Sequence, residues 1–536
     1  MSQQPAPAAF SHLVNLAADE TGTFVLWASD DYFAEKENLV RSDAPVWKEG
    51  VYTDRGKWMD GWESQRMRGP GHDSAILRLG VPGSVEGLLV DTTHFKGNAP
   101  VAVALEVCEA PHTATAEELL SWPVVDAAAA DSAPTAKAWR VALPQSDVRS
   151  DHGNVIALPA PSPRATHVRL RIYPDGGVSR LRVYGVARPA PQLFWQQGSI
   201  DLAAVEHGGR VTAISDAFFG PPANLLLPGR GVNMGDGWET RRRRTPGSDW
   251  CEIGLGRRGL VQRIEIDTHF FKGNAPQACS VLAFDAGAVD PDDAERMAAA
   301  HAGVPSGDDA GWTPLFDLAP LVQHRRHSFE PARPTVATHL RVHIFPHGGV
   351  NRMRVFGLAA PTPREQDKLA ALAALPRADL DALLRSFCGA SAWAQQVARA
   401  LPACSQVRDV MQAADVAFWA LRESDWLEAF AAHPRIGARQ DAAAATAQSA
   451  HWSRSEQAQV QSAAASVTAR LAALNETYFE RFGFIYIVFA TGRDAAQMLA
   501  LLERRLGNGR DTELRNASDE QARITRLRLE NWLLTA

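Results

Sequence analysis

The sequence predicts two tandem antiparallel β-sandwiches of the jelly-roll type, followed by an all-α helical bundle. Three observations support this fold class. They are a domain-sized repeat, short apolar or alternating runs inside each copy of that repeat, and helical periodicity in the remainder. At 536 residues the chain is long enough for several domains. We expect a first repeat at 1–188, a second repeat at 189–362 and a helical domain at 368–536.

The repeat contains two polar phrases that are identical in both copies. Asp-Gly-Trp-Glu occurs at 60–63 and 236–239, and Phe-Lys-Gly-Asn-Ala-Pro occurs at 95–100 and 271–276, with the same spacing in each copy. A duplicated fold requires only the same core pattern, because polar surface positions are free to change. Polar identity at matching positions therefore predicts a duplicated site as well as a duplicated fold.

Both repeats show a pattern typical of β-structure. Short apolar or alternating runs are separated by Gly and Pro, and no long helical period is present. The expected strands include 88–90, 101–103, 168–172, 181–184, 264–266 and 340–344. Two Ala/Asp-rich stretches, 127–134 and 285–311, are interpreted as surface insertions without chemistry.

From Gln366 onward the chain is predicted to be helical. Apolar residues recur there at three- and four-residue spacing, as in Ile524, Leu527 and Leu534 on one face of the last segment. The expected helical segments are 380–400, 415–432, 455–482, 495–506 and 513–534. Such a length is enough for an independent bundle with its own core.

Composition excludes several classes of function. The formal net charge of -6 gives no attraction to nucleic acid or to a membrane surface, and no stretch is apolar enough to span a bilayer. The N-terminus lacks the features of a secretion signal, and the five cysteines form no CxxC pair, which together favour a reduced cytosolic chain. The expected partners are small-molecule substrates and further copies of the same chain, with no nucleic acid and no membrane.

The repeated phrases resemble the allantoicase family. The resemblance rests on Met-Gly-Asp-Gly-Trp-Glu-Thr-Arg-Arg at 234–242 with Asp-Thr-x-x-Phe-Lys-Gly-Asn-Ala-Pro at 267–276, and it extends over about residues 20–360. It implies two tandem jelly-roll repeats. It also implies hydrolysis of allantoate to ureidoglycolate and urea.

The residue types in the phrases suit that substrate. Arginine forks can bind its carboxylate, Asp and Glu can accept from ureido N–H groups or move a proton, and Lys and Asn can stabilise an oxyanion. We expect Glu63, Glu239 and His94 to be catalytic. The expected substrate-binding residues are Asp60, Arg66, Lys96, Asn98, Asp236, Arg242, Lys272 and Asn274. Trp62 and Trp238 are interpreted as packing residues. The competing interpretation makes the Gly-Asn pairs simple turns and the two Asp residues turn caps.

The two copies are not chemically equal. His94 matches Phe270 in the second repeat, which has its histidine one place earlier, at His269. The expectation is therefore either one working site or one composite site. A divalent metal is left open: His94 with Asp91, or His347 with His343, could contribute ligands, although neither spacing is characteristic of a metal site.

The helical part resembles the OHCU (2-oxo-4-hydroxy-4-carboxy-5-ureidoimidazoline) decarboxylase family over about residues 370–536. The matching motifs are Phe-Cys-Gly-Ala-Ser at 387–391, His-Pro-Arg-Ile-Gly at 433–437, Ser-x-x-Glu-Gln at 453–457, Phe-Gly-Phe at 482–484 and Ile-x-Arg-Leu-Arg-Leu at 524–529. The implied reaction converts OHCU to S-allantoin and carbon dioxide without a cofactor.

The resemblance also implies roles for individual residues. His433 matches the catalytic histidine and proton donor, Glu456 its acidic partner, and Arg528, preferred over Arg526, the late arginine. The implied substrate-binding residues are Pro434, Ser453, Gln457, Ile487, Val488, Phe489, Ala490 and Arg526. Physical chemistry agrees, because a decarboxylation leaves a carbanion that must be protonated and histidine titrates near neutrality. A carboxylate such as Glu456 would raise the pKa of His433.

An alternative makes the first part a non-catalytic module. Jelly-roll pairs can bind carbohydrates or other ligands without chemistry, and the two tryptophans with the acidic residues could form such a platform. In that case only the decarboxylase would be active, with the repeats as a ligand-binding attachment. Urea release from allantoate distinguishes the two interpretations.

Overall fold

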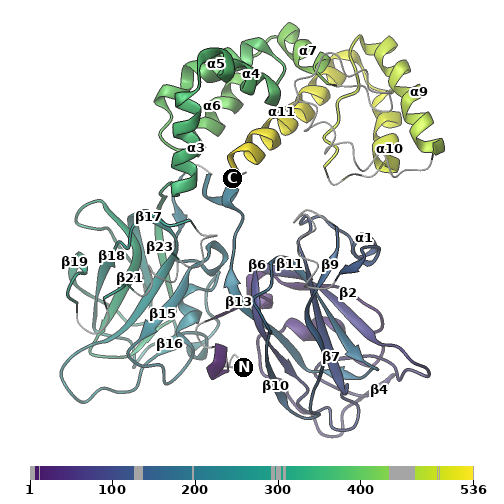
Figure 1. Ribbon diagram of the computed structural model, residues 1–536. Helices are drawn as coiled ribbons and strands as arrows, with labels where there is room; N and C mark the ends of the chain where they lie inside the picture. The colour runs from purple at the N-terminus through teal and green to yellow at the C-terminus, as the bar shows by residue number, and fades with distance from the viewer. Residues whose placement is uncertain are drawn as a thin grey trace. The chain divides into compact units, whose positions relative to one another are not determined.

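The computed structural model describes residues 7–10, 13–125, 137–195, 198–290, 296, 303–305, 309–433, 465–491, 493 and 495–534. The chain forms two compact units, one of residues 1–194 and 198–360, and one of residues 195–197 and 361–536. The first is built of β-strands and the second of helices (Figure 1). This order confirms the predicted fold class. The expected insertion at 127–134 lies outside the described residues, as does most of 285–311.

In the first repeat one long strand, β6 (Asp73–Asp91), organises the sandwich. Its first half pairs antiparallel with β2 (Phe24–Ala28) and β11 (Arg164–Tyr173), and its second half pairs with β10 (Gly153–Ala157) and β13 (Arg180–Ala187). The other strands of the main sheet are β1 (Val14–Asn15), β7 (Ala102–Cys108), β8 (Val124–Val125) and β9 (Trp139–Asp147). The repeat also contains β3 (Tyr52–Thr53), β4 (Gly56–Lys57) and α1 (Ala116–Leu120).

The second repeat follows the same plan around β17 (Asp249–Asp267). This strand pairs with β15 (Arg210–Ile214) and β21 (Thr335–Phe345) through its first half, and with β20 (Arg326–Phe329) and β23 (Arg352–Ala359) through its second half. The sheet continues through β14 (Ile200–Asp201), β18 (Ala278–Phe284) and β19 (Thr313–Pro320). The predicted strand segments lie within these strands except for Val101, which precedes β7, so the β-rich interpretation is confirmed.

One difference from the expectation concerns strand length. Short strands were expected, whereas β6 and β17 each run for 19 residues. Glycines explain how a single strand serves both layers: a Cβ at Gly80 would lie 2.2 Å from the Thr21 carbonyl oxygen, and Gly80 lies between Arg78 and Gly83, where the β6–β11 pairing shifts register. Backbone can approach closely there, and the strand bends without ending.

The helical unit contains α3 (Pro363–Ala374), α4 (Arg377–Phe387), α5 (Ser391–Ala400), α6 (Val407–Trp419), α7 (Glu423–Ala431), α9 (Ala465–Phe482), α10 (Ala495–Arg505) and α11 (Arg510–Leu534). Two segments predicted as continuous are interrupted. Segment 380–400 breaks at Cys388, whose backbone is extended, and Glu428 accepts hydrogen bonds from the amide and hydroxyl of Ser391. Segment 415–432 breaks before α7, where the Asp425 carboxylate accepts from the amide of the N-cap residue Arg422. Capping by side chains therefore prevails over the apolar period.

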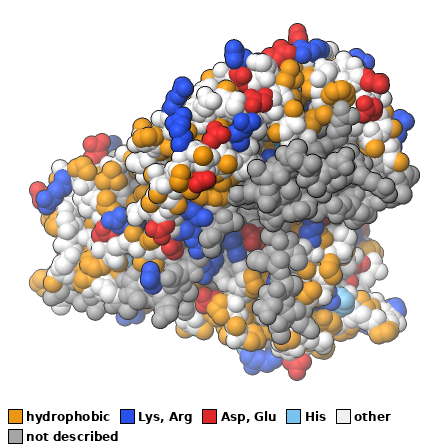
Figure 2. Space-filling model, turned by 45° about the horizontal axis from the view of Figure 1, so that its top comes forward, with side chains coloured by type: hydrophobic (Ala, Val, Ile, Leu, Met, Phe, Trp, Pro, Cys, Tyr) orange, Lys and Arg blue, Asp and Glu red, His pale blue; other side chains and the backbone are white. Residues whose placement is uncertain are grey.

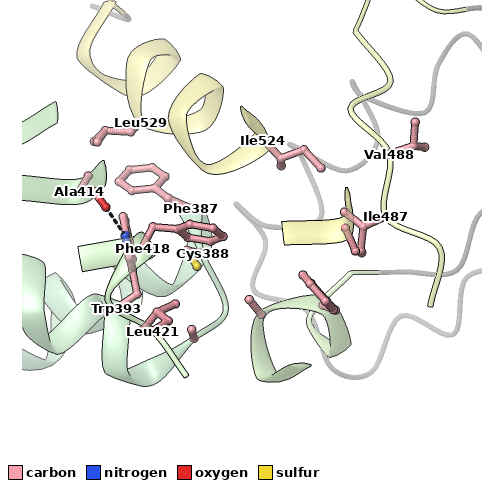
Figure 3. Close-up of a cluster of buried hydrophobic side chains, with 14 of the residues drawn as sticks. Phe387, Cys388, Trp393, Ala414, Phe418, Leu421, Ile487, Val488, Ile524 and Leu529 are labelled. Carbon is pink, nitrogen blue, oxygen red and sulfur yellow. Dashed lines mark hydrogen bonds between the residues drawn. The ribbon is translucent and has the colours of Figure 1, made fainter. Parts of the chain in front are cut away.

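The core of this unit contains Phe387, Trp393, Phe418, Leu529 and their neighbours (Figure 3). The Trp393 indole N–H donates to the Ala414 carbonyl at 2.9 Å. On α11, Ile524 is buried as predicted, but Leu527 and Leu534 are only half-buried. Polar Gln521, Thr525 and Arg528 share the buried face instead. A helix buries polar groups at this density where they have partners or a ligand.

All five cysteines are free thiols, and four of them are buried. None of the helices that the structure describes has the length and apolar character needed to cross a membrane. Acidic and basic side chains occur side by side on the molecular face in Figure 2. This agrees with the small net charge.

A buried ion pair holds the segment after α9 in place. Arg505 donates to the Glu513 carboxylate and, at 2.8 Å, to the Ile487 carbonyl, while the Tyr478 hydroxyl donates to Glu513 at 2.6 Å. Arg505 is 4% exposed and Glu513 is fully buried. Losing one partner would leave an uncompensated buried charge, which is far more costly than losing an exposed pair.

We predict that Arg505→Met lowers the free energy of unfolding of the helical unit by about 3–5 kcal/mol, because the Glu513 carboxylate loses its counter-charge. Denaturant unfolding followed by far-ultraviolet circular dichroism, which reports helix content, measures the change. Arg504→Met is the matched control, since Arg504 is the exposed neighbour on the same helix. Equal stability of the two variants would contradict this role for the pair.

Candidate active sites

The repeated aromatic residue of each copy packs against glycines. Phe95 and Phe271 are fully buried. A Cβ at Gly177 would lie 1.9 Å from the Phe95 ring and one at Gly61 would lie 2.8 Å from it; the Gly349 position is likewise 1.9 Å from the Phe271 ring. The glycines of the repeated phrases therefore leave the space that these rings fill. This contact joins the two polar phrases within each repeat.

That packing places a carboxylate beside an amide. β5 (Trp62–Glu63) pairs with β12 (Gly177–Val178), and the Gly177 amide donates to the Asn98 carbonyl at 2.7 Å. The Asn98 side-chain amide then donates to Glu63 Oε1, also at 2.7 Å. Burial raises the pKa of Glu63, and the Asn98 hydrogen bond opposes the shift. A buried carboxylate with a raised pKa is suited to proton transfer.

The second repeat reproduces the pair. β16 (Trp238–Glu239) pairs with β22 (Gly349–Val350), and the Asn274 side chain donates to Glu239 Oε1 at 2.7 Å. Glu239 is half-buried, whereas Glu63 is 9% exposed. Asn274 also lies 3.6 Å from the Met234 sulfur. The two copies thus share their geometry and differ in how far the carboxylate is shielded.

The tryptophans of the phrases have a structural role. Trp62 and Trp238 are fully buried. Their indole N–H groups donate to the carbonyls of Asp30 at 2.7 Å and Asp216 at 2.9 Å. The packing interpretation is confirmed.

The aspartates of the phrases are bound to arginines that the sequence analysis missed. Asp60 Oδ2 lies 3.0 Å from Arg180 Nη2, and Asp236 Oδ2 lies 3.0 Å from Arg352 Nη2. All four side chains are buried. A Gly-Val phrase two residues before each arginine, in matching positions of the repeats, is the sequence feature that could have revealed them. These pairs anchor the loops that precede the glutamates.

The predicted cations of the phrases are exposed. Arg66, Lys96, Arg242 and Lys272 all lie at the surface. Lys96 is 3.8 Å from Asp151, and the other three form no hydrogen bond or ion pair with a described residue. The structure therefore gathers Glu63 with Asn98, and Glu239 with Asn274, but does not bring these cations onto the pairs.

His94 occupies a left-handed turn, with a φ of 74°. Its amide donates to Asp151 at 2.8 Å, and its ring nitrogen lies 3.4 Å from the Pro45 carbonyl oxygen. Phe270 has a φ of 70° at the matching position. The turn, rather than the imidazole, is what the two copies share.

The suggested metal ligands do not assemble into a site. Asp91 accepts from the Thr93 amide, and His343 lies 3.1 Å from Asp309. Within the described ranges no three His, Cys, Asp or Glu side chains are positioned to hold a metal ion. No chemical step is assigned to a metal here.

In the helical unit, His433 follows the end of α7 and faces α11. Burial and then the positive charge of Arg528 lower the pKa of His433 to about 3, and the neighbouring Gln521 opposes the shift. The imidazole is therefore neutral at physiological pH. Gln521, a residue that the sequence analysis missed, is fully buried, and its Oε1 atom has no well-formed hydrogen bond within the described part of the chain.

The two candidate arginines differ in position. Arg528 is 4% exposed, and its Nη1 donates to the Ser386 carbonyl at 3.4 Å. Arg526 points to the surface, where it pairs with Asp415 at 2.8 Å and Glu530 at 2.9 Å. Arg528 therefore shares the buried face with Gln521 and acts on His433, whereas Arg526 does not.

The backbone after Phe-Gly-Phe is held by side chains. Ile487 and Val488 are buried (Figure 3), and Phe489 and Ala490 are half-buried. The Phe489 amide donates to Glu520, and Arg493 donates to the Phe489 carbonyl at 3.1 Å. The remaining predicted residues, Pro434, Ser453, Glu456 and Gln457, lie outside the described residues. The expected effect of Glu456 on the pKa of His433 therefore stays a prediction.

Two sandwiches, each with a Glu–Asn pair, and a helical unit with a half-buried histidine near a buried arginine define a two-part enzyme for small polar substrates. The model of the allantoicase repeat matches residues 14–188 and 200–360, and the OHCU decarboxylase model matches residues 373–530. The chain belongs to the allantoicase family and carries an OHCU decarboxylase domain after the repeats.

Individual relatives and solved structures are similar to parts of this chain. An allantoicase of Dictyostelium discoideum is 40% identical over 356 residues, covering 65% of this chain and 88% of that protein. A probable allantoicase of Photobacterium profundum is 42% identical over 355 residues, covering 65% and 97%. A crystal structure of allantoicase from Saccharomyces cerevisiae has a TM-score of 0.50 at 29% identity, covering 64% of this chain and 93% of that chain. A crystal structure of OHCU decarboxylase in the presence of (S)-allantoin is 32% identical, covering 28% and 96%, with a TM-score of 0.24.

We predict that Arg528→Met raises the pKa of His433, because removing a positive charge favours the imidazolium form. Titration of the histidine ring signals by NMR measures it, with the His433 signal identified by its loss in His433→Gln. Arg526→Met is the control, since that arginine is exposed and paired elsewhere. An unchanged pKa in Arg528→Met, or an equal rise in both variants, would show that Arg528 does not act on His433.

Proposed function

We propose that this chain catalyses two reactions of purine catabolism. The repeats hydrolyse allantoate to ureidoglycolate and urea, and the helical unit decarboxylates OHCU to S-allantoin. The observation that carries the proposal for the repeats is the Glu–Asn contact of 2.7 Å, formed twice by residues of the repeated phrases. A structural role alone does not require a carboxylate and an amide in contact at the same place in both copies.

Hydrolysis of allantoate breaks one carbon–nitrogen bond. Water supplies a hydroxyl group to the carbon that carries the two ureido groups, and a proton to the nitrogen of the departing urea. Glu63 or Glu239 is suited to accept the proton of the attacking water and to return it to the leaving group. The neighbouring Asn98 or Asn274 amide keeps the carboxylate oriented and leaves its second oxygen available for substrate N–H groups.

Decarboxylation of OHCU breaks a carbon–carbon bond. Carbon dioxide leaves, the electron pair stays on the ring carbon, and a proton must then be delivered to one face of that carbon. Arg528, a buried permanent cation, is suited to bind the anionic substrate and balance its charge. His433, neutral when the site is empty, can take up a proton as the negatively charged substrate binds and then transfer it.

The two reactions are not consecutive. The product S-allantoin must first be opened to allantoate before the repeats can act on it. Transfer of one product directly into the other site is therefore not required. Fusion in one chain provides equal amounts of the two activities.

The ligand-binding alternative loses its main support. A carbohydrate platform needs exposed aromatic faces, and Trp62 and Trp238 are fully buried with their indole N–H groups bonded to backbone carbonyls. Catalysis by the Glu–Asn pairs is consequently the stronger proposal.

We expect His433→Ala in the full chain to reduce OHCU decarboxylation about a hundredfold or more, since it removes the proton-transfer group. Urea release from allantoate by the same preparation should be unchanged, because the repeats form a separate compact unit. Carbon dioxide release and urea release are measured in parallel. Loss of both activities in a folded variant would contradict independent sites, and absence of urea release from the unmodified chain would restore the ligand-binding alternative.

A further inference from the structure

A cavity of about 100 Å³ lies between the two repeats, inside the first compact unit. The first repeat lines it with residues of β1 and β13, and the second repeat lines it with β15 and the 3₁₀ helix Pro222–Leu226. Val205 of the second repeat packs into the core of the first. The cavity therefore lies in a packed interface, is partly open, and is not lined by residues of the Asp-Gly-Trp-Glu or Phe-Lys-Gly-Asn-Ala-Pro phrases.

Arg182 brings an unsatisfied donor to this cavity. The residue is 2% exposed, and its Nη1 atom has no hydrogen-bond partner in the described part of the molecule. Its other guanidinium contact is a 3.4 Å hydrogen bond from Nη2 to the Asp43 carbonyl. Burial lowers the pKa of Arg182. A buried guanidinium with an unmet N–H group is costly unless an acceptor can occupy the adjoining space.

The second repeat offers an internal comparison. Arg354 is the counterpart of Arg182 in the repeated Arg-Val-aromatic-Gly phrase. Its Nη atoms donate to the carbonyls of Leu225, Leu227 and Gly229 at 3.3, 2.6 and 2.9 Å, and its Nε lies 3.4 Å from Asp201. In the second repeat Arg354 is therefore bonded to backbone carbonyls. In the first repeat its counterpart Arg182 lines the cavity and has a donor without a partner in the described part of the molecule.

Two residues of the second repeat add donors to the same cavity. Asn224 is 2% exposed and its side-chain nitrogen has no partner within the described ranges, although its counterpart Asn38 donates to the Gly61 carbonyl at 3.0 Å. Arg210 stands where the first repeat has Phe24, and its guanidinium forms no hydrogen bond or ion pair with a described residue. Burial lowers the pKa of Arg210. At both positions the second repeat therefore has a donor that is unbonded within the described residues, whereas the first repeat has a bonded asparagine at one position and a phenylalanine at the other.

The chemistry of the lining selects a ligand class. Arg182, Arg210 and the side-chain nitrogen of Asn224 supply hydrogen-bond donors, and the acidic residue of the lining, Glu20, is exposed. A planar carboxylate matches the arginine fork. The apolar wall, which includes Leu13, Val211 and Leu226, suits a short hydrocarbon part. A water molecule needs about 10–15 Å³ of such volume, so several water-sized groups can be accommodated.

We propose that the cavity between the repeats binds a small carboxylate anion through Arg182, Arg210 and Asn224. The carboxylate lies against both arginines and accepts from the Asn224 amide, so that one ligand contacts both repeats at once. The occupant is either an allantoate molecule bound apart from the Glu–Asn pairs or a separate small carboxylic acid. The binding test below does not depend on the proposed hydrolysis, which is measured separately.

The test is calorimetric titration of the full chain with glycolate, with glycolamide as the neutral analogue. Glycolate should bind saturably and glycolamide should not. Arg210→Gln should weaken glycolate binding at least about tenfold, since a hydrogen-bonded charge is removed. Arg325→Gln, at an exposed arginine outside the cavity, should have no effect. Asn224→Leu is a second variant that keeps both charges and should also weaken binding.

Urea-release kinetics of Arg210→Gln then identify the occupant. A raised KM indicates the carboxylate of allantoate, and an unchanged KM with lost glycolate binding indicates a separate acid. Thermal unfolding establishes that each variant is folded. The proposal is overturned if glycolate does not bind saturably to the unmodified chain, or if folded Arg210→Gln and Asn224→Leu bind it as tightly as Arg325→Gln does.

Discussion

The packing of one aromatic ring against two glycines determines the geometry of each repeat. Phe95 fills the space beside Gly61 and Gly177, and Phe271 does the same beside Gly237 and Gly349. Each ring holds the Phe-Lys-Gly-Asn loop against the strand that contains the glutamate. A side chain at either glycine would push the ring away. The Glu–Asn contact, and with it the chemistry proposed for the repeats, depends on this steric fit.

The two repeats share the Glu–Asn contact and differ in other contacts around it. Asp60–Arg180 and Asp236–Arg352 repeat the same buried ion pair, which anchors the loop in each copy. Arg182 and Arg354, by contrast, have become different: one is bonded to backbone carbonyls and the other faces the cavity between the repeats. These matched residues with unequal contacts are where the two repeats differ in the donors that they offer to a ligand.

Much of the architecture could be predicted from the sequence because it follows from local patterns. Alternating runs predicted strands, and the repeated phrases predicted a duplicated site. The lengths of some elements and the breaks between them were predicted wrongly. The strand β6 stays continuous because glycines allow it to bend, and the 380–400 segment breaks because Glu428 caps α5. Those outcomes depend on contacts between distant residues, which a linear pattern does not contain.

The candidate sites also contain residues that the sequence could predict and residues that it could not. Residue types in the repeated phrases pointed to Glu63 and Asn98, and the family resemblance pointed to His433 and Arg528. The exposure of Arg66 and Lys96 followed from loop geometry that the phrases do not encode. Gln521 was missed because it has no motif of its own, and Arg180 was missed although a repeated Gly-Val phrase precedes it. The preference for Arg528 over Arg526 rested on family pattern, and the buried face of α11 provides its physical reason.

Urea release by Glu63→Gln, Glu239→Gln and the double variant tests the central claim most directly. The substitution keeps size and hydrogen bonding to the asparagine and removes only the ability to take up a proton. If the Glu–Asn pairs perform the hydrolysis, the double variant should lose activity about a hundredfold or more, and the single variants show which repeat contributes. Near-normal urea release by the folded double variant would contradict the account.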